Sequence, residues 1–165
     1  VVKLNNWHQK RISQLIIQKL FGTITGKKIA ILGFAFKANT NDTRESSAIN
    51  ICKELMIEGG DLRIYDPKVK YNQIKKNLDE FEETNNTGTV SEGSWEVFDS
   101  FNKCYEEVDA IVIMTEWEEF KFINWRKIHK EMRKPAWVFD TRSIINIQEV
   151  KDSGINYWRI GEGIT

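Results

Sequence analysis

The chain alternates between short continuous apolar runs and longer segments whose apolar residues recur at helical spacing. The continuous runs are KIAIL (28–32), LRIYD (62–66), DAIVIM (109–114) and AWVFD (136–140), and INYWRIG (155–161) closes the chain. Runs of this kind are typical of strands that are buried on both faces of a sheet. Five strands separated by helical segments predict an α/β domain with a doubly wound, mostly parallel sheet.

The segment before the first strand predicts a leading amphipathic helix over residues 5–21. Its apolar residues Ile12, Leu15, Ile16 and Leu20 share one face. Gly22 fits the position just after a helix end. A second helix is expected between the first two strands, with Asp42 and Glu45 as a capping box, and shorter helices at 125–132 and 145–151.

Residues 79–107 carry mostly acidic charge, interrupted by the stretch TNNTGTVSEGS. The acids lack the register of a calcium-binding loop, so a solvated surface insertion is favoured over a metal site. No metal is expected in this chain.

Composition restricts the classes of function. The 165 residues are 41% hydrophobic and 29% charged, and 24 basic residues balance 24 acidic ones, so the net charge is zero. These values predict one folded domain without a field that would steer it to nucleic acid or an anionic membrane. No membrane span or signal segment is visible, so a cytoplasmic location is expected. Cys52 and Cys104 lie far apart and predict buried thiols. The missing initial Met suggests a fragment of a longer protein.

Ligands of a doubly wound sheet bind beyond the carboxyl ends of its strands. After the first strand comes GFAFKANTNDTRES, where Ala35 and Ala38 occupy places that a dinucleotide-binding G-x-G-x-x-G turn gives to glycine. The loop offers side-chain cations instead, at Lys37 and Arg44, which suit a diphosphate. The alternative is a solvated loop in which Arg44 pairs with Asp42 or a neighbouring acid.

Arg142 stands just beyond the strand that ends at residue 140, in the run FDTRS. Lys37 holds the same place beyond the first strand, so the two cations can converge on one anionic ligand. The alternative is that Arg142 pairs with Asp140 as a structural support.

Three further features follow the strands. Asp66 either binds a ribose or caps the turn at its strand end, and the cap is favoured. Glu116 can contact a ligand, whereas Trp117, Phe120 and Phe122 are expected to pack the next connection. No nucleophile with a matching base is recognisable, so no catalytic residue is assigned.

The runs KKIAILGFAFKANTNDTRES, LRIYDPKV, DAIVIMTEW and VFDTR, in this order, resemble the carboxyl-terminal domain of the UDP-glucose 6-dehydrogenases, within the UDP-glucose/GDP-mannose dehydrogenase family. The resemblance covers nearly the whole chain except residues 77–97. It implies a Rossmann-like domain over 23–165 that binds UDP-glucose, with residues 1–22 as the end of a central connecting helix. It also implies an amino-terminal NAD-binding domain as partner, NAD as cofactor and a homo-oligomer.

By the same resemblance, Phe36, Lys37 and Arg142 correspond to substrate-binding positions, and Arg44 to a position that touches NAD across the domain interface. The family oxidises UDP-glucose to UDP-glucuronate in two NAD-dependent steps through a cysteine that this chain lacks, so the chain alone is expected to be inactive. Thr141 replaces a family glycine, and a positive φ there would strain the turn and displace Arg142. Two alternatives stay open: a non-catalytic dimerisation or regulatory module, and the same domain of a GDP-mannose or UDP-N-acetyl-sugar dehydrogenase.

Overall fold

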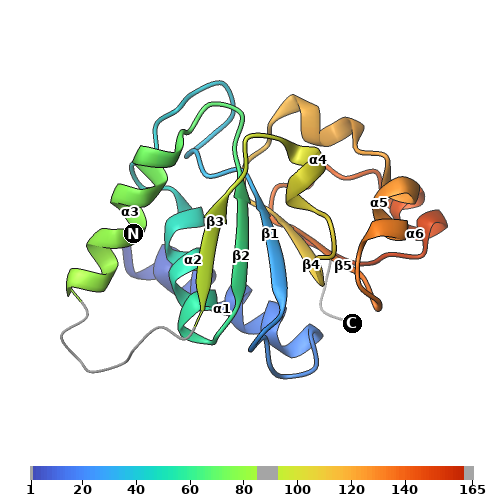
Figure 1. The fold of residues 1–165 in the computed structure, drawn as a ribbon, viewed down its shortest axis with the longest axis horizontal. Helices are drawn as coiled ribbons and strands as arrows, with labels where there is room; N and C mark the ends of the chain where they lie inside the picture. Colours follow the sequence, from blue (N-terminus) through green and yellow to red (C-terminus); the bar gives the residue numbers. More distant parts are fainter. Residues whose placement is uncertain (1, 85–92, 162–165) are drawn as a thin grey trace.

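The structure is a computed structural model that describes residues 2–84 and 93–161 (Figure 1). Within these ranges the strands are β1 (Lys28–Leu32), β2 (Asp61–Tyr65), β3 (Ser94–Val97), β4 (Ala110–Ile113), β5 (Trp137–Asp140) and β6 (Asn156–Arg159). They form one six-stranded sheet in the order β3-β2-β1-β4-β5-β6, and every neighbouring pair is parallel. The predicted doubly wound parallel sheet is confirmed, with one strand more than the sequence indicated.

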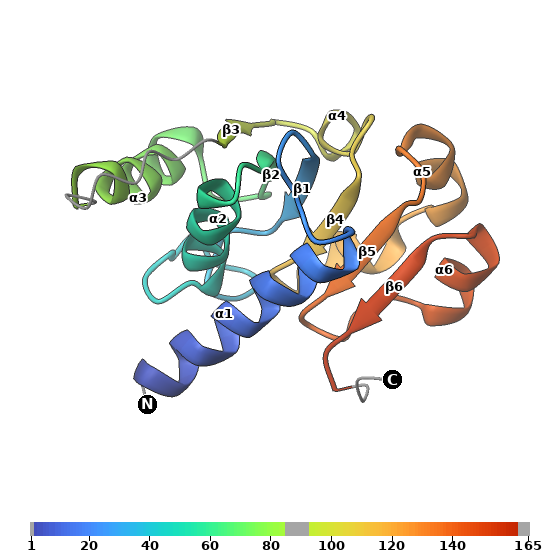
Figure 2. The ribbon, with the colours of Figure 1, turned by 90° about the horizontal axis from the view of Figure 1, so that it is seen from below.

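The helices cover both faces of this sheet. They are α1 (Val2–Lys19), α2 (Ser47–Ile57), α3 (Tyr71–Thr84), α4 (Phe101–Cys104), α5 (Trp125–Glu131) and α6 (Ile147–Ser153), with a short 3-10 helix η1 (Glu118–Phe122). Figure 2 shows α1 and α2 on one face and α4, α5 and α6 on the other. After β1 the chain adds β2 and β3 on one side of β1. It then crosses back and adds β4, β5 and β6 on the other side, so the strand order reverses between β1 and β4. Ligands of such sheets bind at this switch point.

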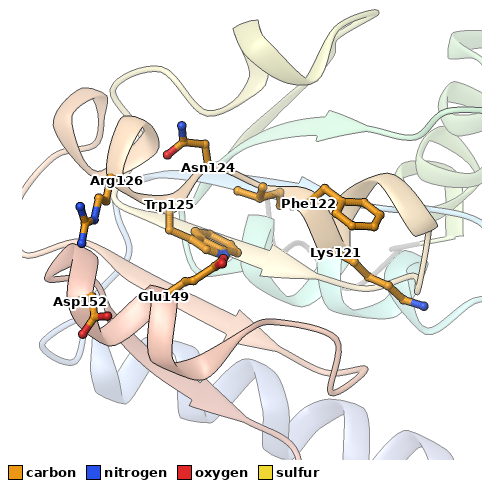
Figure 3. Close-up of a pocket in the computed structure, with 8 residues that line it drawn as sticks. Lys121, Phe122, Asn124, Trp125, Arg126, Glu149 and Asp152 are labelled. Carbon is orange, nitrogen blue, oxygen red and sulfur yellow. The ribbon is translucent and has the colours of Figure 1, made fainter.

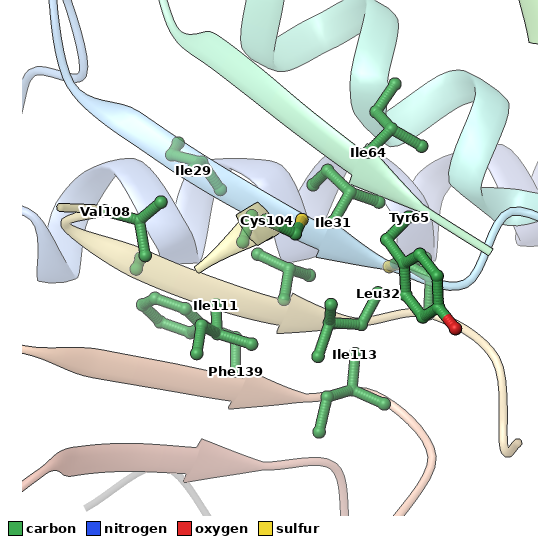
Figure 4. Packing of buried hydrophobic residues seen from close by; sticks show 14 of the residues in the cluster. Ile29, Ile31, Leu32, Ile64, Tyr65, Cys104, Val108, Ile111, Ile113 and Phe139 are labelled. Carbon is green, nitrogen blue, oxygen red and sulfur yellow. The ribbon is translucent and has the colours of Figure 1, made fainter. Parts of the chain in front are cut away.

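The central strands are apolar because both of their faces are covered. Ile29, Ile31 and Leu32 on β1 have no exposed surface, and neither have Ile111 and Ile113 on β4 (Figure 4). Each fully buried side chain of this size stabilises the fold by about 1.5–3 kcal/mol. The sheet is therefore a rigid base for the loops that leave its carboxyl edge.

The apolar face of α1 belongs to this core. Ile16 and Leu20 are buried, and α1 is joined to α2 by a hydrogen bond from Ser13 to Glu54. The helix ends at Lys19, and both Phe21 and Gly22 then have a positive φ, of 68° and 80°. This face packs within the chain, and a dimer formed through the same helix stays a prediction.

The segment between residues 71 and 107 differs from the expected surface insertion. The helix α3 occupies its start, and β3 and α4 lie inside the acid-rich stretch. β3 pairs with β2 from Ser94 to Val97, and its side chains alternate between exposed and half-buried because it is an edge strand. The stretch 79–107 therefore contains a strand and helices that the sequence did not predict, and its middle, 85–92, lies outside the described residues.

The start of α2 also differs from the expectation. Ser46 is the residue that caps this helix, since its hydroxyl accepts a hydrogen bond from the Ala48 amide at 3.3 Å and donates to the Phe34 carbonyl at 2.8 Å. Asp42 and Glu45 form no capping box, and Glu45 has a positive φ of 60°. The cap ties the first turn of α2 to the loop after β1.

Along residues 2–84 and 93–161, no helix combines the length and apolar character that crossing a membrane requires.

Candidate functional site

Two consecutive residues beyond β4 connect the loops at the carboxyl edge of the sheet. The Thr115 hydroxyl donates a hydrogen bond to the Ala35 carbonyl at 2.9 Å. Glu116 Oε1 accepts one from the Ala38 amide at 3.0 Å. Thr115 is buried, so the first of these bonds is shielded from water. The loops after β1 and β4 are thereby held together at the switch point.

Arg142 reaches the same place from the end of β5. Its Nε donates to the Met114 carbonyl at 2.9 Å and its Nη2 to the Phe36 carbonyl at 3.3 Å. Its Nη1 lies 3.3 Å from Glu116 Oε2. The structure therefore places Arg142 against the residue that precedes Lys37. That the two cations meet on one anionic ligand stays a prediction.

Asp140 is not the partner of the Arg142 guanidinium. Its Oδ1 accepts a hydrogen bond from the Arg142 backbone amide at 2.9 Å. Its Oδ2 accepts from the amides of Ile144 and Ile145 at 2.7 and 2.9 Å. Asp140 is fully buried, so it shapes the turn that carries Arg142, and the ion pair is made by Glu116 instead.

The backbone strain that the sequence predicted at Thr141 is absent. In the described chain the positive φ of this turn, 59°, falls on Ser143. The Thr141 hydroxyl donates to the Ile113 carbonyl at 2.6 Å. This bond anchors the turn to β4, so Thr141 supports the position of Arg142.

Phe36 and Lys37 face outward from the loop after β1. Phe36 is 43% exposed, whereas Phe34 is fully buried in the core. The Lys37 side chain is exposed and, within the described residues, its ammonium makes no hydrogen bond or ion pair. The charge of Lys37 makes a small contribution to lowering the pKa of Asp42, after the larger effect of Arg44. Lys37 is thus a cation whose charge no neighbouring carboxylate neutralises by contact.

Arg44 is engaged with Asp42 in the same loop. Its Nε lies 3.0 Å from Asp42 Oδ1 and its Nη2 2.8 Å from Oδ2, although 88% of the Arg44 side chain is exposed. The Arg44 side-chain hydrogen bonds hold the pKa of Asp42 down to about 2. The pairing that the sequence analysis left open is therefore present. The structure does not bring Arg44 into the contacts around Arg142.

α3 fixes the middle of this loop through Thr43. The buried Thr43 hydroxyl accepts hydrogen bonds from Gln73 Nε2 at 3.0 Å and Asn77 Nδ2 at 2.8 Å. This contact was not predicted, because α3 was not recognised in the sequence and a hydrogen bond between segments 30 or more residues apart leaves no local signal.

The electrostatic state of Glu116 follows from its contacts. Burial alone would raise its pKa, but the Ala38 amide hydrogen bond and the nearby Arg142 guanidinium outweigh that effect, so the pKa lies below its usual value. Glu116 is therefore ionised near neutral pH and attracts Arg142. The sequence suggested a ligand contact for this residue, and the structure shows a contact between protein loops.

Asp66 is a structural cap. Its Oδ2 accepts from the amides of Phe34 and Ala35 at 2.7 and 3.0 Å and from Trp117 Nε1 at 3.1 Å. Its Oδ1 accepts from the amides of Lys68 and Val69 at 2.8 and 2.9 Å. With both oxygens occupied and only 6% of the residue exposed, Asp66 is not available to a ribose.

These residues do not fit an NAD site within this chain. The turn after β1 has Ala35 and Ala38 in place of two glycines, and the acid that would bind the ribose is occupied. Both cysteines, Cys52 and Cys104, are free and buried, as predicted, and burial raises the pKa of the Cys104 thiol to about 12. Among the described residues, no group of three or more His, Cys, Asp or Glu side chains is arranged to hold a metal.

A cavity of about 480 Å³ lies elsewhere, between the η1–α5 segment and α6 (Figure 3). Its lining comprises Lys121, Phe122, Ile123, Asn124, Trp125, Arg126, Glu149 and Asp152. Two basic and two acidic side chains balance there, so the cavity has no charge that would select an anion. Phe122 is 78% exposed, which corrects the expectation that it packs the connection, whereas Trp117 and Phe120 are buried as expected.

Comparison with known proteins agrees with this geometry. Residues 30–147 match the UDP-glucose/GDP-mannose dehydrogenase family, UDP binding domain. The chain is 40% identical to UDP-glucose 6-dehydrogenase of Drosophila melanogaster over 98% of its length and 34% of that protein. It is also 40% identical to UDP-glucose 6-dehydrogenase of Caenorhabditis elegans, over 98% of the chain and 33% of that protein. The chain thus spans about a third of the length of these relatives.

Solved structures give the same result. The UDP-D-ManNAc dehydrogenase of Pyrococcus horikoshii superposes with a TM-score of 0.68 and 30% identity, over 94% of this chain and 30% of that one. The NDP-N-acetyl-D-galactosaminuronic acid dehydrogenase of Methanosarcina mazei superposes with a TM-score of 0.72 over 95% of this chain and 29% of that one, and its 21% identity supports the fold alone. The match over residues 30–147, together with the sheet order and the relatives, shows that the chain belongs to the UDP-glucose/GDP-mannose dehydrogenase family, as its UDP binding domain.

Proposed function

We propose that this chain binds the UDP part of UDP-glucose within a longer dehydrogenase that oxidises UDP-glucose to UDP-glucuronate with two NAD. The observation that supports this most is the hydrogen bond of 3.3 Å from Arg142 Nη2 to the Phe36 carbonyl. It joins two cation-bearing loops, far apart in the sequence, at the edge where ligands of such sheets bind.

Lys37 and Arg142 have different tasks in this proposal. Lys37 is exposed and, among residues 2–84 and 93–161, has no carboxylate in contact, so its charge is available to a diphosphate oxygen. Arg142 is already held by two carbonyls and by Glu116, and its remaining N–H groups form a fixed fork for ligand oxygens. Phe36 offers its exposed ring to the same ligand.

The redox chemistry belongs to the rest of the enzyme. NAD would be held by an amino-terminal domain, and Arg44 would touch it from this chain after exchanging its contact with Asp42. Cys52 is fully buried, and burial raises its pKa, so it is unsuited to act as a nucleophile. We therefore expect the isolated chain to bind the nucleotide sugar without turning it over, and the full enzyme to be a homo-oligomer.

UDP-glucose is favoured over other nucleotide sugars by the relatives. Proteins named UDP-glucose 6-dehydrogenase reach 40% identity over almost the whole chain, whereas the UDP-D-ManNAc dehydrogenase reaches 30%.

Titration calorimetry of the full chain with UDP-glucose, and separately with NAD, tests the proposal. We expect UDP-glucose to bind weakly, near about 1 mM, because the ligand is enclosed by this chain on one side only. Lys37→Ala should weaken binding roughly tenfold or more, since a charge-assisted hydrogen bond is lost. Lys130→Ala, at another exposed lysine, is the matched control. Tighter binding of NAD, or equal affinities for the wild type and Lys37→Ala, would contradict the proposal.

A further inference from the structure

We propose that Glu116 is the positioning residue of the nucleotide-sugar site, because its two carboxylate oxygens hold the Lys37 loop and Arg142 in one fixed arrangement. This inference rests on the proposed function of Lys37 and Arg142. It assigns to Glu116 no contact with the ligand itself.

The two oxygens of Glu116 face different loops. Oε1 accepts the hydrogen bond from the amide of Ala38, the residue next to Lys37. Oε2 lies 3.3 Å from Arg142 Nη1. One carboxylate therefore connects the loop after β1 to the loop after β5 across the end of β4.

The backbone on either side keeps Glu116 in place. The Thr115 hydroxyl donates a hydrogen bond to the Ala35 carbonyl, and the Trp117 indole donates one to the buried Asp66 carboxylate. Thr115 has no exposed surface and Trp117 only 6%. The carboxylate thus extends from a segment that packing and hydrogen bonds make rigid, as a positioning group requires.

Arg142 needs such a partner. Its guanidinium is planar and binds best when its plane is fixed, and two carbonyls hold only one edge of it. Side chains of the Glu116 and Arg142 pair are 34% and 31% exposed, so water screens the pair only partly. Without the carboxylate, the Arg142 head gains rotational freedom and the Ala38 amide loses its acceptor. Both changes loosen the two loops that the ligand has to bridge.

The test is an NMR titration of the full chain with UDP-glucose, because chemical shifts report weak binding and the melting temperature is measured on the same samples. The variants are Glu116→Gln, Arg142→Ala, their combination, Lys37→Ala, and Glu118→Gln as the control. Glu118 is two residues away, 73% exposed at its side chain and paired with the exposed Lys121. Glu116→Gln should weaken UDP-glucose on the order of tenfold, and Glu118→Gln should leave the affinity unchanged.

The affinity of the double variant distinguishes a positioning role of Glu116 from an effect on stability alone. If Glu116 acts through Arg142, adding Glu116→Gln to Arg142→Ala should weaken binding by much less than it does alone. A lower melting temperature with unchanged affinity, or fully multiplicative effects in the double variant, would overturn the positioning role. If Lys37→Ala and Arg142→Ala weaken binding while Glu116→Gln does not, the positioning role alone is wrong. If neither Lys37→Ala nor Arg142→Ala changes the affinity, the proposed function is wrong and the positioning role with it.

Discussion

A Cβ atom on Gly33 would lie 2.4 Å from Cβ of Thr115, closer than any non-bonded carbon can approach. Gly33 also has a φ of +96°, a conformation that glycine adopts readily and other residues rarely do. The close approach lets the first residue of the loop after β1 lie directly against the segment after β4, where Glu116 is held.

Gly33→Ala should therefore destabilise the fold by about 2–4 kcal/mol, since backbone strain of about 1–2 kcal/mol adds to the displacement of a buried side chain. Urea unfolding measures this loss. Gly26→Ala is the matched control, because Gly26 has a similar φ of +74° but nothing within 4 Å of its Cβ position. The free energy of unfolding of Gly26→Ala should fall only by the part that comes from backbone strain. Equal losses in the two variants would show that the contact with Thr115 does not affect stability.

Asp66 should be essential for stability. In Asp66→Asn one oxygen becomes an NH2 group, so at least two of the five N–H groups that point at this side chain face another donor. We expect a loss of about 3 kcal/mol or more, because buried donors without an acceptor are costly. Asp99→Asn, at an exposed position, should change stability by less than about 0.5 kcal/mol. Near-native stability of Asp66→Asn, with reduced affinity for a nucleotide, would instead favour the ribose role.

The attachment of α3 to the Arg44 loop depends on one hydroxyl. Thr43→Val keeps the shape of the side chain but removes the acceptor of two amide hydrogen bonds, from Gln73 and Asn77. The free energy of unfolding should fall by about 1–2 kcal/mol. Thr25→Val, whose exposed hydroxyl makes one bond of 3.3 Å to Glu58, should cost less than about 0.5 kcal/mol. A loss of equal size at position 25 would mean that the attachment contributes nothing specific.

The sequence predicted those parts of the fold whose signal is local. KIAIL is readable as a buried strand because β1 has neighbours on both sides and helices on both faces. SWEV was missed because β3 is an edge strand with half-exposed side chains in an acidic context. α3 was missed although its apolar residues Tyr71, Ile74 and Leu78 recur at helical spacing. They stand among polar and charged residues that run on into the acid-rich stretch.

The candidate site, like the fold, was predictable from the sequence only in part. The rule for strand ends in doubly wound sheets predicted that Lys37 and Arg142 lie at one edge, and the structure brings their loops into contact. The partner of Arg142 was not predictable, because Asp140 and Glu116 both lie near it and only the tertiary structure decides which carboxylate faces the guanidinium. The buried backbone amides of the turn occupy Asp140, which leaves Glu116.

The pair formed by Asp42 and Arg44 allows a prediction that links the loop to its proposed contact with NAD. The pKa of Asp42 is lowered to about 2 mainly by the Arg44 side chain, so the stabilisation from this pair is present above the ordinary Asp pKa of about 3.9 and is lost as the pH falls toward 2. In Arg44→Ala the Asp42 pKa should rise toward about 3.9, as an NMR titration of its carboxyl carbon would show. Lys121→Ala, which breaks the exposed pair with Glu118, should leave Asp42 unchanged. If Asp42 still titrated near 2 without Arg44, the guanidinium would not be bound to it in solution, and Arg44 would be free to meet a phosphate without first losing a partner.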